Sequence, residues 1–292
     1  MGRFEAVRIL PFLVLCLVCV SGADPTPLFE KKRKPGPSDW LARFKEPHRT
    51  FKDYRASRPV RAHKGDVLRF VPTGEFDEKG QALLEQTIAF SSIWFDLPVD
   101  VTKAQSLPKK GWQRLNGGQR QVRTPWFLQH LLPPFRKDDA VCVSAITMAD
   151  LYPDEKWNFV FGEASLRGRV GVWSFARLSH GTPEVALRRC CKLVVHEIGH
   201  MFGLHHCVVY ECDMNGSNHL PELDSQPLHL CPRCLRKLVW NRGWKRAAVM
   251  ERYRKLCAFY EKYGLAPEAK WIKRRLASLS AANPPSKTSR PG

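Results

Sequence analysis

Three histidines and one glutamate are spaced so that together they could hold a metal ion and activate water. His196 and His200 are four residues apart, so on a helix they lie on one face and can bind the same ion. Glu197 lies one position round the helix, towards the open side of the metal, where a general base is needed. Gly203 follows where the chain must turn back, a left-handed position that favours glycine. The turn returns His206 as a third ligand, and three imidazoles leave one tetrahedral position for water, as in a catalytic zinc site.

The full pattern of these residues is more specific than its first half. A bare H-E-x-x-H occurs by accident in many helices, and the alternative interpretation is a helix with surface histidines. Gly203 and His206 make such an accident rare, because the chain has only 19 glycines and 10 histidines in 292 residues. The extended pattern is the metzincin signature, whose members also have a methionine turn beneath the metal. Met214 is the only methionine between Met201 and Met250, and we assign it to that turn.

Four cysteines that follow the third histidine form a second candidate metal site; they are Cys207, Cys212, Cys231 and Cys234. Two short cysteine pairs separated by a long loop are typical of a four-cysteine zinc site, and the C-x-x-C knuckle is its most specific part. The alternative is two disulfides. Zinc is favoured because a disulfide between Cys231 and Cys234 would close a small, strained ring. Four thiolates fill the tetrahedron, so this zinc would be structural.

From His196 to Cys234 the sequence resembles the archaemetzincin (archaelysin) family, whose pattern runs H-E-x-x-H-x-x-G-x-x-H-C-x4-C-x-M and ends in C-x-x-C. Segments 145–166 and 171–177 are similar to the blocks that precede the zinc helix in that family, and the resemblance covers about residues 66–265. It implies a zinc metallopeptidase of α+β, zincin-like (metzincin) fold, with a small C-terminal lobe that carries the four-cysteine site. It also implies two zinc ions per chain. His196, His200 and His206 would hold the catalytic zinc, the four cysteines the structural zinc, and Glu197 would be the base.

Composition divides the chain into four segments. Residues 1–23 have a charged start, a 12-residue apolar core and a small-residue end, which is typical of a secretory signal peptide. We therefore expect a secreted protein; the alternatives are an uncleaved anchor, a mis-assigned start or incidental apolar segment, and an intracellular protein, as in most of the family. Residues 24–65 are interpreted as an N-terminal extension or linker, in which the segment from Ser38 to Leu41 could dock on the core. Residues 66–265 form the expected catalytic domain, and 266–292 a basic C-terminal helix and tail.

Hydrophobic spacing predicts the elements that position these residues. We expect strands at 65–74, 97–101 and 139–147, and helices at 81–95, 124–132, 184–200, 244–264 and 268–279. Segments 157–165 and 169–177 flank a turn, and in the family a strand of this kind borders the cleft and pairs with extended substrate. We assign substrate binding to Phe161, Gly162, Glu163 and Ala164. The alternative is an ordinary strand pair.

Several other residues of reactive type are given structural interpretations. Cys142 is expected in the core, and Cys190 and Cys191 are expected to be core residues or free thiols rather than metal ligands. Asn215 begins a glycosylation sequon, but we expect no glycan because it lies between the zinc ligands. His219 is interpreted as a loop histidine rather than a ligand, since three ligands are already present.

The chain is strongly basic, with a formal net charge of +19, and from Leu235 onwards it has 15 Lys and Arg against 3 Glu. Such a field attracts acidic peptides, nucleic acid or anionic glycans, although a soluble basic surface is the simpler interpretation. No nucleic-acid-binding motif accompanies the charge. We expect a monomer without a stable membrane span that acts on a peptide or protein substrate, with an anionic partner possible at the basic C-terminal region. The alternative function is a non-catalytic, zinc-stabilised binding or scaffold protein.

Overall fold

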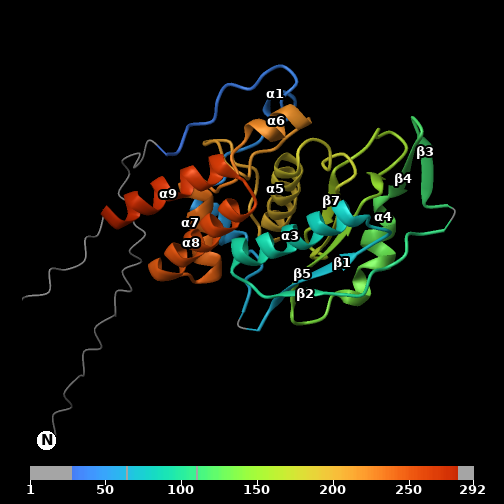
Figure 1. The fold of residues 1–292 in the computed structure, drawn as a ribbon, viewed down its shortest axis with the longest axis horizontal. Coiled ribbons are helices and arrows are strands. Elements are labelled where there is room, and N and C mark those ends of the chain that lie inside the picture. The colour runs from blue at the N-terminus through green and yellow to red at the C-terminus, as the bar shows by residue number, and fades with distance from the viewer. Residues whose placement is uncertain (1–27, 64, 110, 282–292) are drawn as a thin grey trace, which may run out of the picture.

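The structure is a computed structural model that describes residues 28–63, 65–109 and 111–281. It combines α-helices with twisted, mixed β-sheets, and helices α3 and α5 lie across one face of the main sheet (Figure 1). The expected leader at 1–23 and the end of the C-terminal tail lie outside the described residues, so secretion stays a prediction.

The main sheet has five strands, in the order β2 (Val99–Val101), β1 (Val67–Pro72), β5 (Ala140–Thr147), β8 (Val170–Ser174) and β7 (Gly162–Ser165). The first four run parallel, and β7 is antiparallel to β8. All eight residues of β5 are buried, as expected of a central strand covered on both faces. The strands predicted at 65–74, 97–101 and 139–147 are thus confirmed.

Helices α3 (Glu78–Phe95) and α5 (Pro183–Met201) pack against each other and share the larger hydrophobic core. Asp77 begins α3 by accepting a hydrogen bond from Gly80 N at 2.7 Å. Both helices begin one to three residues before their predicted starts at 81 and 184, because the capping residues precede the first apolar positions.

A second, smaller core lies around Phe127, Leu132 and Val143. It is covered by a sheet of β3 (Gln113–Asn116), β4 (Gln119–Arg123) and β6 (Asp150–Tyr152), and by the helical turns α4 (Thr124–Trp126), η1 (Phe127–Leu131) and η2 (Pro133–Phe135). The predicted helix at 124–132 is found as α4 and η1. The small sheet was not predicted, because β3 and β4 consist mainly of polar residues.

The remaining helices are α1 (Trp40–Arg43), α2 (Phe51–Ala56), α6 (Leu220–Ser225), α7 (Pro232–Arg242), α8 (Arg246–Lys262) and α9 (Ala266–Ala281). Arg252 in α8 donates to the carbonyl of Trp94 in α3 at 2.7 Å, and Trp271 in α9 donates to the carbonyl of Leu28 at 2.9 Å. The part of the N-terminal extension that the structure describes and the helices α8 and α9 therefore pack on the same core as the sheet. The helices predicted at 244–264 and 268–279 are confirmed, and α9 is longer than expected.

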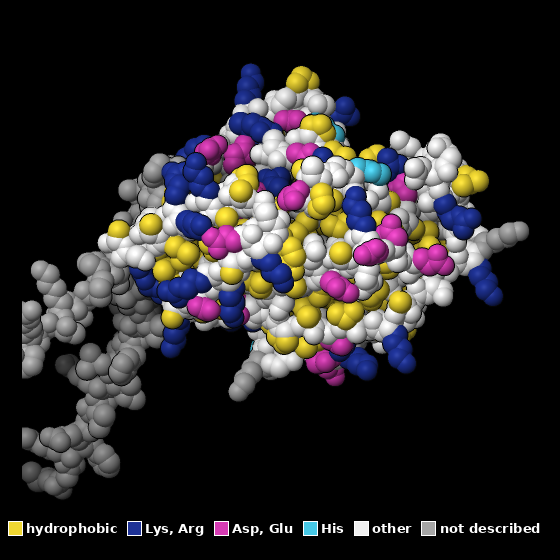
Figure 2. Space-filling view, viewed as in Figure 1, with side chains coloured by type: hydrophobic (Ala, Val, Ile, Leu, Met, Phe, Trp, Pro, Cys, Tyr) yellow, Lys and Arg dark blue, Asp and Glu magenta, His cyan; other side chains and the backbone are white. Residues whose placement is uncertain are grey.

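Lys and Arg side chains are scattered over the face shown in Figure 2, among acidic and hydrophobic side chains. Binding of an anionic partner at the basic C-terminal helices stays a prediction. In the part of the chain that the structure describes, no helix is both long and apolar enough to span a bilayer.

The indole of Trp173 in β8 lies across two glycines, and this gives a stability prediction. A Cβ on Gly171 would lie 2.3 Å from the indole, and one on Gly162 2.4 Å. We expect Gly171→Ala to lower the free energy of unfolding by about 1–3 kcal/mol, because the buried ring has no room to move. Urea denaturation measures this. Gly36→Ala is the matched control, since its Cβ would meet nothing closer than 3.5 Å. Equal stabilities of the two variants would contradict the prediction.

Candidate active site and metal centres

Helix α5 and the turn after it place the three histidines and the glutamate. Thr182 caps the helix by accepting a hydrogen bond from Val185 N at 3.4 Å. Past the last helical residue, Gly203 has a φ of +79° and donates from its N–H to the carbonyl of His200 at 2.8 Å. This is the left-handed turn that the glycine predicted, and it brings His206 back towards the helix.

The three imidazoles face one another, with ring centroids 4.6, 4.9 and 5.2 Å apart, and one ring nitrogen from each lies within 4.8 Å of the others. Each Nδ1 has its own acceptor. That of His196 donates to the carbonyl of Asp213 at 2.7 Å, and that of His200 to the carbonyl of Leu204 at 2.6 Å. That of His206 donates to a carboxylate oxygen, Oε1 of Glu46, at 2.6 Å. Because these acceptors hold the proton on Nδ1, every Nε2 keeps a lone pair for a metal.

Burial also keeps two of these rings neutral. It lowers the pKa of His200 to about 3 and that of His196 well below its usual value, and in both cases the neighbouring histidines lower it further. Neutral imidazole is the form that binds metal, so the residues fit a zinc ion.

Glu197 is half-buried, and desolvation raises the pKa of its carboxyl to about 7, although the field of His206 opposes the rise. A carboxyl in this range can both accept and return a proton near neutral pH. Glu197 therefore has the proton affinity that a general base requires.

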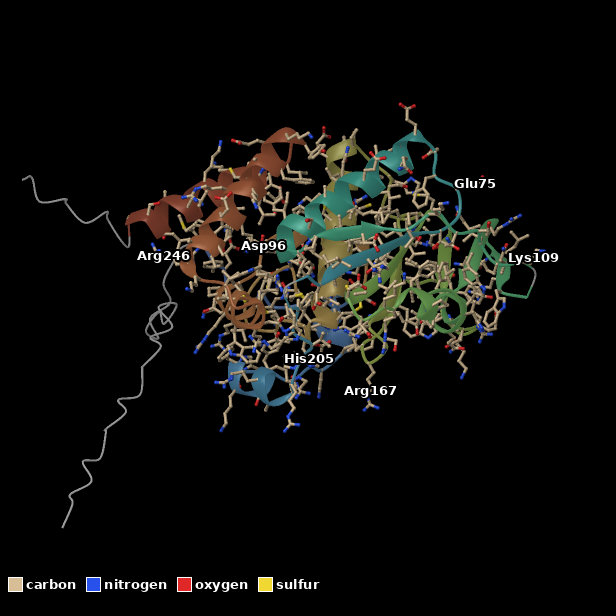
Figure 3. All side chains as sticks on the ribbon, turned by 90° about the horizontal axis from the view of Figure 1, so that it is seen from below. Glu75, Asp96, Lys109, Arg167, His205 and Arg246 are labelled. Atoms are coloured by element: carbon tan, nitrogen blue, oxygen red, sulfur yellow. The ribbon has the colours of Figure 1, made fainter. Side chains whose placement is uncertain are left out.

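The site opens into a cleft of about 800 Å³. Its lining includes the histidines, residues 157–164, several residues of the 213–218 loop, and Trp40, Glu46, Pro47 and Arg49 from the N-terminal extension. In Figure 3, His205 lies beside the N-terminal segment drawn in blue, while Arg167 marks the turn between β7 and β8. Segments far apart in sequence thus meet at one opening.

The four residues assigned to substrate binding lie at this cleft. Phe161, Gly162, Glu163 and Ala164 all line it, and β7 is the last strand of its sheet, so one edge of β7 is unpaired among the described strands. The carboxylate of Glu163 accepts a hydrogen bond from Thr124 Oγ1. This hydrogen bond ties the side chain of Glu163 to Thr124 at the start of α4.

Met214 lies fully buried, close to the active-site helix. A Cβ on Gly199 would lie 2.8 Å from its sulfur, so the glycine makes room for the methionine within the turn of helix that carries His200. The preceding residue, Asp213, supplies the carbonyl that orients His196. The segment of Asp213 and Met214 therefore contacts both the histidine helix and the ring of His196.

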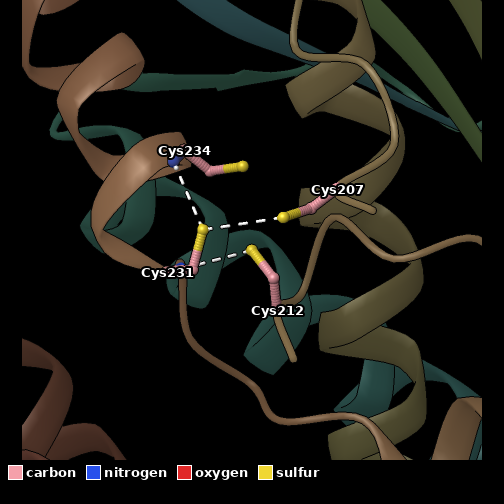
Figure 4. A group of neighbouring side chains, drawn as sticks. All are labelled: Cys207, Cys212, Cys231 and Cys234. Atoms are coloured by element: carbon pink, nitrogen blue, oxygen red, sulfur yellow. Dashed lines mark hydrogen bonds between the residues drawn. The ribbon is translucent and has the colours of Figure 1, made fainter. Parts of the chain in front are cut away.

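The four cysteines converge from two segments of the chain (Figure 4). All are buried and free, and their sulfurs lie within 4.8 Å of one another. The sulfurs of Cys207 and Cys231 are 3.6 Å apart, far beyond the roughly 2.05 Å of a disulfide. Cys231 also caps α7, since its sulfur accepts from Cys234 N at 3.5 Å. Four thiols around one point fit a closed tetrahedral zinc site.

Asn215 and His219 take structural roles. The buried amide of Asn215 donates to the carbonyls of Cys207 and Tyr210 and accepts from Cys212 N, which leaves it no freedom to carry a glycan. His219 caps α6 by accepting from Glu222 N at 3.1 Å, and its other nitrogen lies 3.2 Å from Asp39. Cys142, Cys190 and Cys191 are buried in the core.

Sequence reasoning missed Glu46 and Trp40. The sequence indicated that the segment from Ser38 could dock on the core, and Trp40 does so, but no local signal placed it at the three histidines. The contact between Glu46 and His206 joins residues 160 positions apart.

Comparison with known proteins agrees with this geometry. The model of "Peptidase family M54" matches residues 128–240. Archaemetzincin-2 of Rattus norvegicus is 32% identical over an alignment that covers 89% of this chain and 79% of the relative. The chain belongs to the archaemetzincin family. Archaemetzincin-2 of Homo sapiens is 43% identical over 152 residues, which cover 41% of each chain. The solved archaemetzincin of Methanopyrus kandleri is 29% identical, with a TM-score of 0.51, over 61% of this chain and 97% of that one.

Archaemetzincin membership favours a zinc-dependent metallopeptidase, a hydrolase that acts on peptides or proteins, over the non-catalytic scaffold. It also supports zinc as the metal. The roles of individual residues, the number of zinc ions and the oligomeric state stay predictions.

Proposed function

We propose that the chain hydrolyses peptide bonds at the three-histidine site, with His196, His200 and His206 holding one zinc ion. The observation that carries this proposal is the set of three Nδ1 hydrogen bonds, which leaves every Nε2 free for a metal in the cleft that Glu197 also lines. Zinc bound there would supply Lewis acidity, polarising the scissile carbonyl and making water a stronger nucleophile.

The chain's own residues would do the rest of the chemistry. Glu197 takes a proton from the attacking water and gives it to the leaving amine, a role that suits a carboxyl whose pKa burial raises to about 7. The free edge of β7, from Gly162 to Ser165, holds the substrate in extended form through main-chain hydrogen bonds. Trp157 and Leu166 line the same cleft with half of each side chain exposed, at 53% and 50%, and would contact apolar substrate residues.

A second zinc ion would occupy the four-cysteine site and have no catalytic role, because four thiolates leave no open position. The finer fold class is then the zincin-like fold of the metzincins, with the Met214 turn beneath the histidines. This assignment is supported by the contact of Met214 with Gly199 and by the order of the ligands along the chain.

A broad peptide library separates the peptidase from a scaffold. We expect the zinc-loaded full chain to cleave library peptides, a chelator to abolish cleavage, and added zinc to restore it. The sequences of the cleaved peptides would also show which substrate residues are preferred beside Trp157 and Leu166. Zinc-loaded protein that cuts no peptide in the library would favour the scaffold instead.

A further inference from the structure

The N-terminal extension reaches the third histidine directly. Glu46 Oε1 accepts from His206 Nδ1 at 2.6 Å and from Trp40 Nε1 at 2.5 Å. The indole of Trp40 also meets the His206 ring edge to face, with centroids 5.1 Å apart. His206 is therefore the one histidine of the three whose Nδ1 partner is a carboxylate, and the one oriented from outside the segment 196–213.

The segment that carries Glu46 is held in place by contacts with α6 and with the loop before it. The main-chain N–H of Trp40 donates to both carboxylate oxygens of Glu222 at 3.0 Å, and Asn218 Nδ2 donates to the carbonyl of Ser38 at 2.9 Å. Gly216 has no side chain where the indole lies, since a Cβ there would be 2.5 Å from the ring. These contacts tie α1 to α6 and the loop before it, and the two helices lie side by side above α5 (Figure 1).

We propose that Glu46, an acidic residue of the N-terminal extension, is a positioning residue for the third zinc ligand. This inference rests on the proposed function, because it assumes that His206 binds zinc through Nε2. A carboxylate behind a ligand histidine fixes the tautomer and the ring orientation and raises the basicity of the ligand nitrogen. The residue lies outside the segment 128–240 that matches the family model.

The test measures zinc affinity at the histidine site of the full chain by competition with a chelator. Cobalt(II) is loaded in parallel, because thiolate ligands give strong charge-transfer absorption that imidazole ligands lack, so the two sites are monitored separately. The variants are Glu46→Gln, which keeps the shape and removes the charge, and Glu46→Ala, which removes the acceptor. Asp39→Asn is the control. It weakens the contact of the segment with His219 but leaves Glu46 untouched.

We expect the affinity of the histidine site to fall about tenfold in Glu46→Gln and towards a hundredfold in Glu46→Ala, the range found for residues that orient metal ligands. The thiolate absorption of the four-cysteine site should stay near that of the parent in every variant, and Asp39→Asn should keep the parental affinity at the histidine site. Excess zinc should restore kcat of Glu46→Gln. Parent-like affinity in both Glu46 variants would overturn the proposal, as would an equal loss in Asp39→Asn.

A His206→Ala variant separates this proposal from the proposed function. We expect it to lose zinc at the histidine site. If it keeps that zinc, the ligand set itself is wrong. If it loses the zinc while both Glu46 variants bind zinc as tightly as the parent, only the role of Glu46 is refuted.

Discussion

Replacing Glu197 with glutamine is expected to lower kcat by a factor of about 10²–10⁴ while both metals remain bound, which is the usual contribution of a general base. The amide has nearly the same shape and touches the same cleft, but it cannot take a proton from water. No hydrogen bond from a ligand histidine ends on Glu197, since each Nδ1 has another acceptor. Zinc content and thermal stability should therefore be close to those of the parent.

The assay compares kcat on one library-derived peptide, with zinc content measured on the same samples. Glu184→Gln is the matched control, because Glu184 lies in the first turn of the same helix and does not line the cleft. We expect it to keep parental activity. Hydrolysis by Glu197→Gln at the parental rate would remove Glu197 from the mechanism, even if the histidines still bind zinc.

Cys231→Ser is expected to lower the zinc content from about two to about one per chain and to lower the melting temperature. Serine is a good helix cap, so it can replace the capping role of Cys231 on α7, and the loss reports the metal alone. Structural zinc is worth about 10 kcal/mol in small zinc-finger peptides, and a domain with its own core should lose less. With about 3–5 kcal/mol lost, the melting temperature should fall by roughly 10 °C.

Zinc stoichiometry and thermal unfolding of the full chain check this result. Cys257→Ser is the control, because Cys257 is a nearly buried cysteine of α8 outside the cluster. Activity should persist in the fraction of Cys231→Ser that stays folded, although Cys207 adjoins His206 and the catalytic zinc should bind more weakly. One zinc per parent chain, with no free thiol at the four positions, would mean disulfides.

The features that could be predicted from sequence depend on short spacings. His196 and His200 share a helix face because of their separation, and the burial of β5 follows from its unbroken apolar run. The four cysteines were grouped by the spacing within each pair, and the structure brings them together. In each case the pattern is formed by residues that are close together in the sequence.

The features that could not be predicted depend on contacts between distant segments. Glu46 is a single acidic residue in a proline-containing stretch, and it reaches His206 because Trp40 packs against Gly216 and hydrogen-bonds to Glu222. The small sheet was missed for another reason. Strand β4 is mostly polar, and a buried hydrogen bond from Gln121 to Asp150 adds to the backbone ladder that joins it to β6.

His206 is held from both directions along the chain, by Glu46 far upstream and, through Cys207, by a cluster whose last sulfur belongs to Cys234. During synthesis, a ribosome that has released helix α5 has not yet released those last cysteines. We therefore expect a nascent chain to lack a competent active site until Cys234 has emerged and the N-terminal segment has folded back. The order in which the chain is synthesised would then delay proteolysis until the four cysteines and the N-terminal segment are both in place.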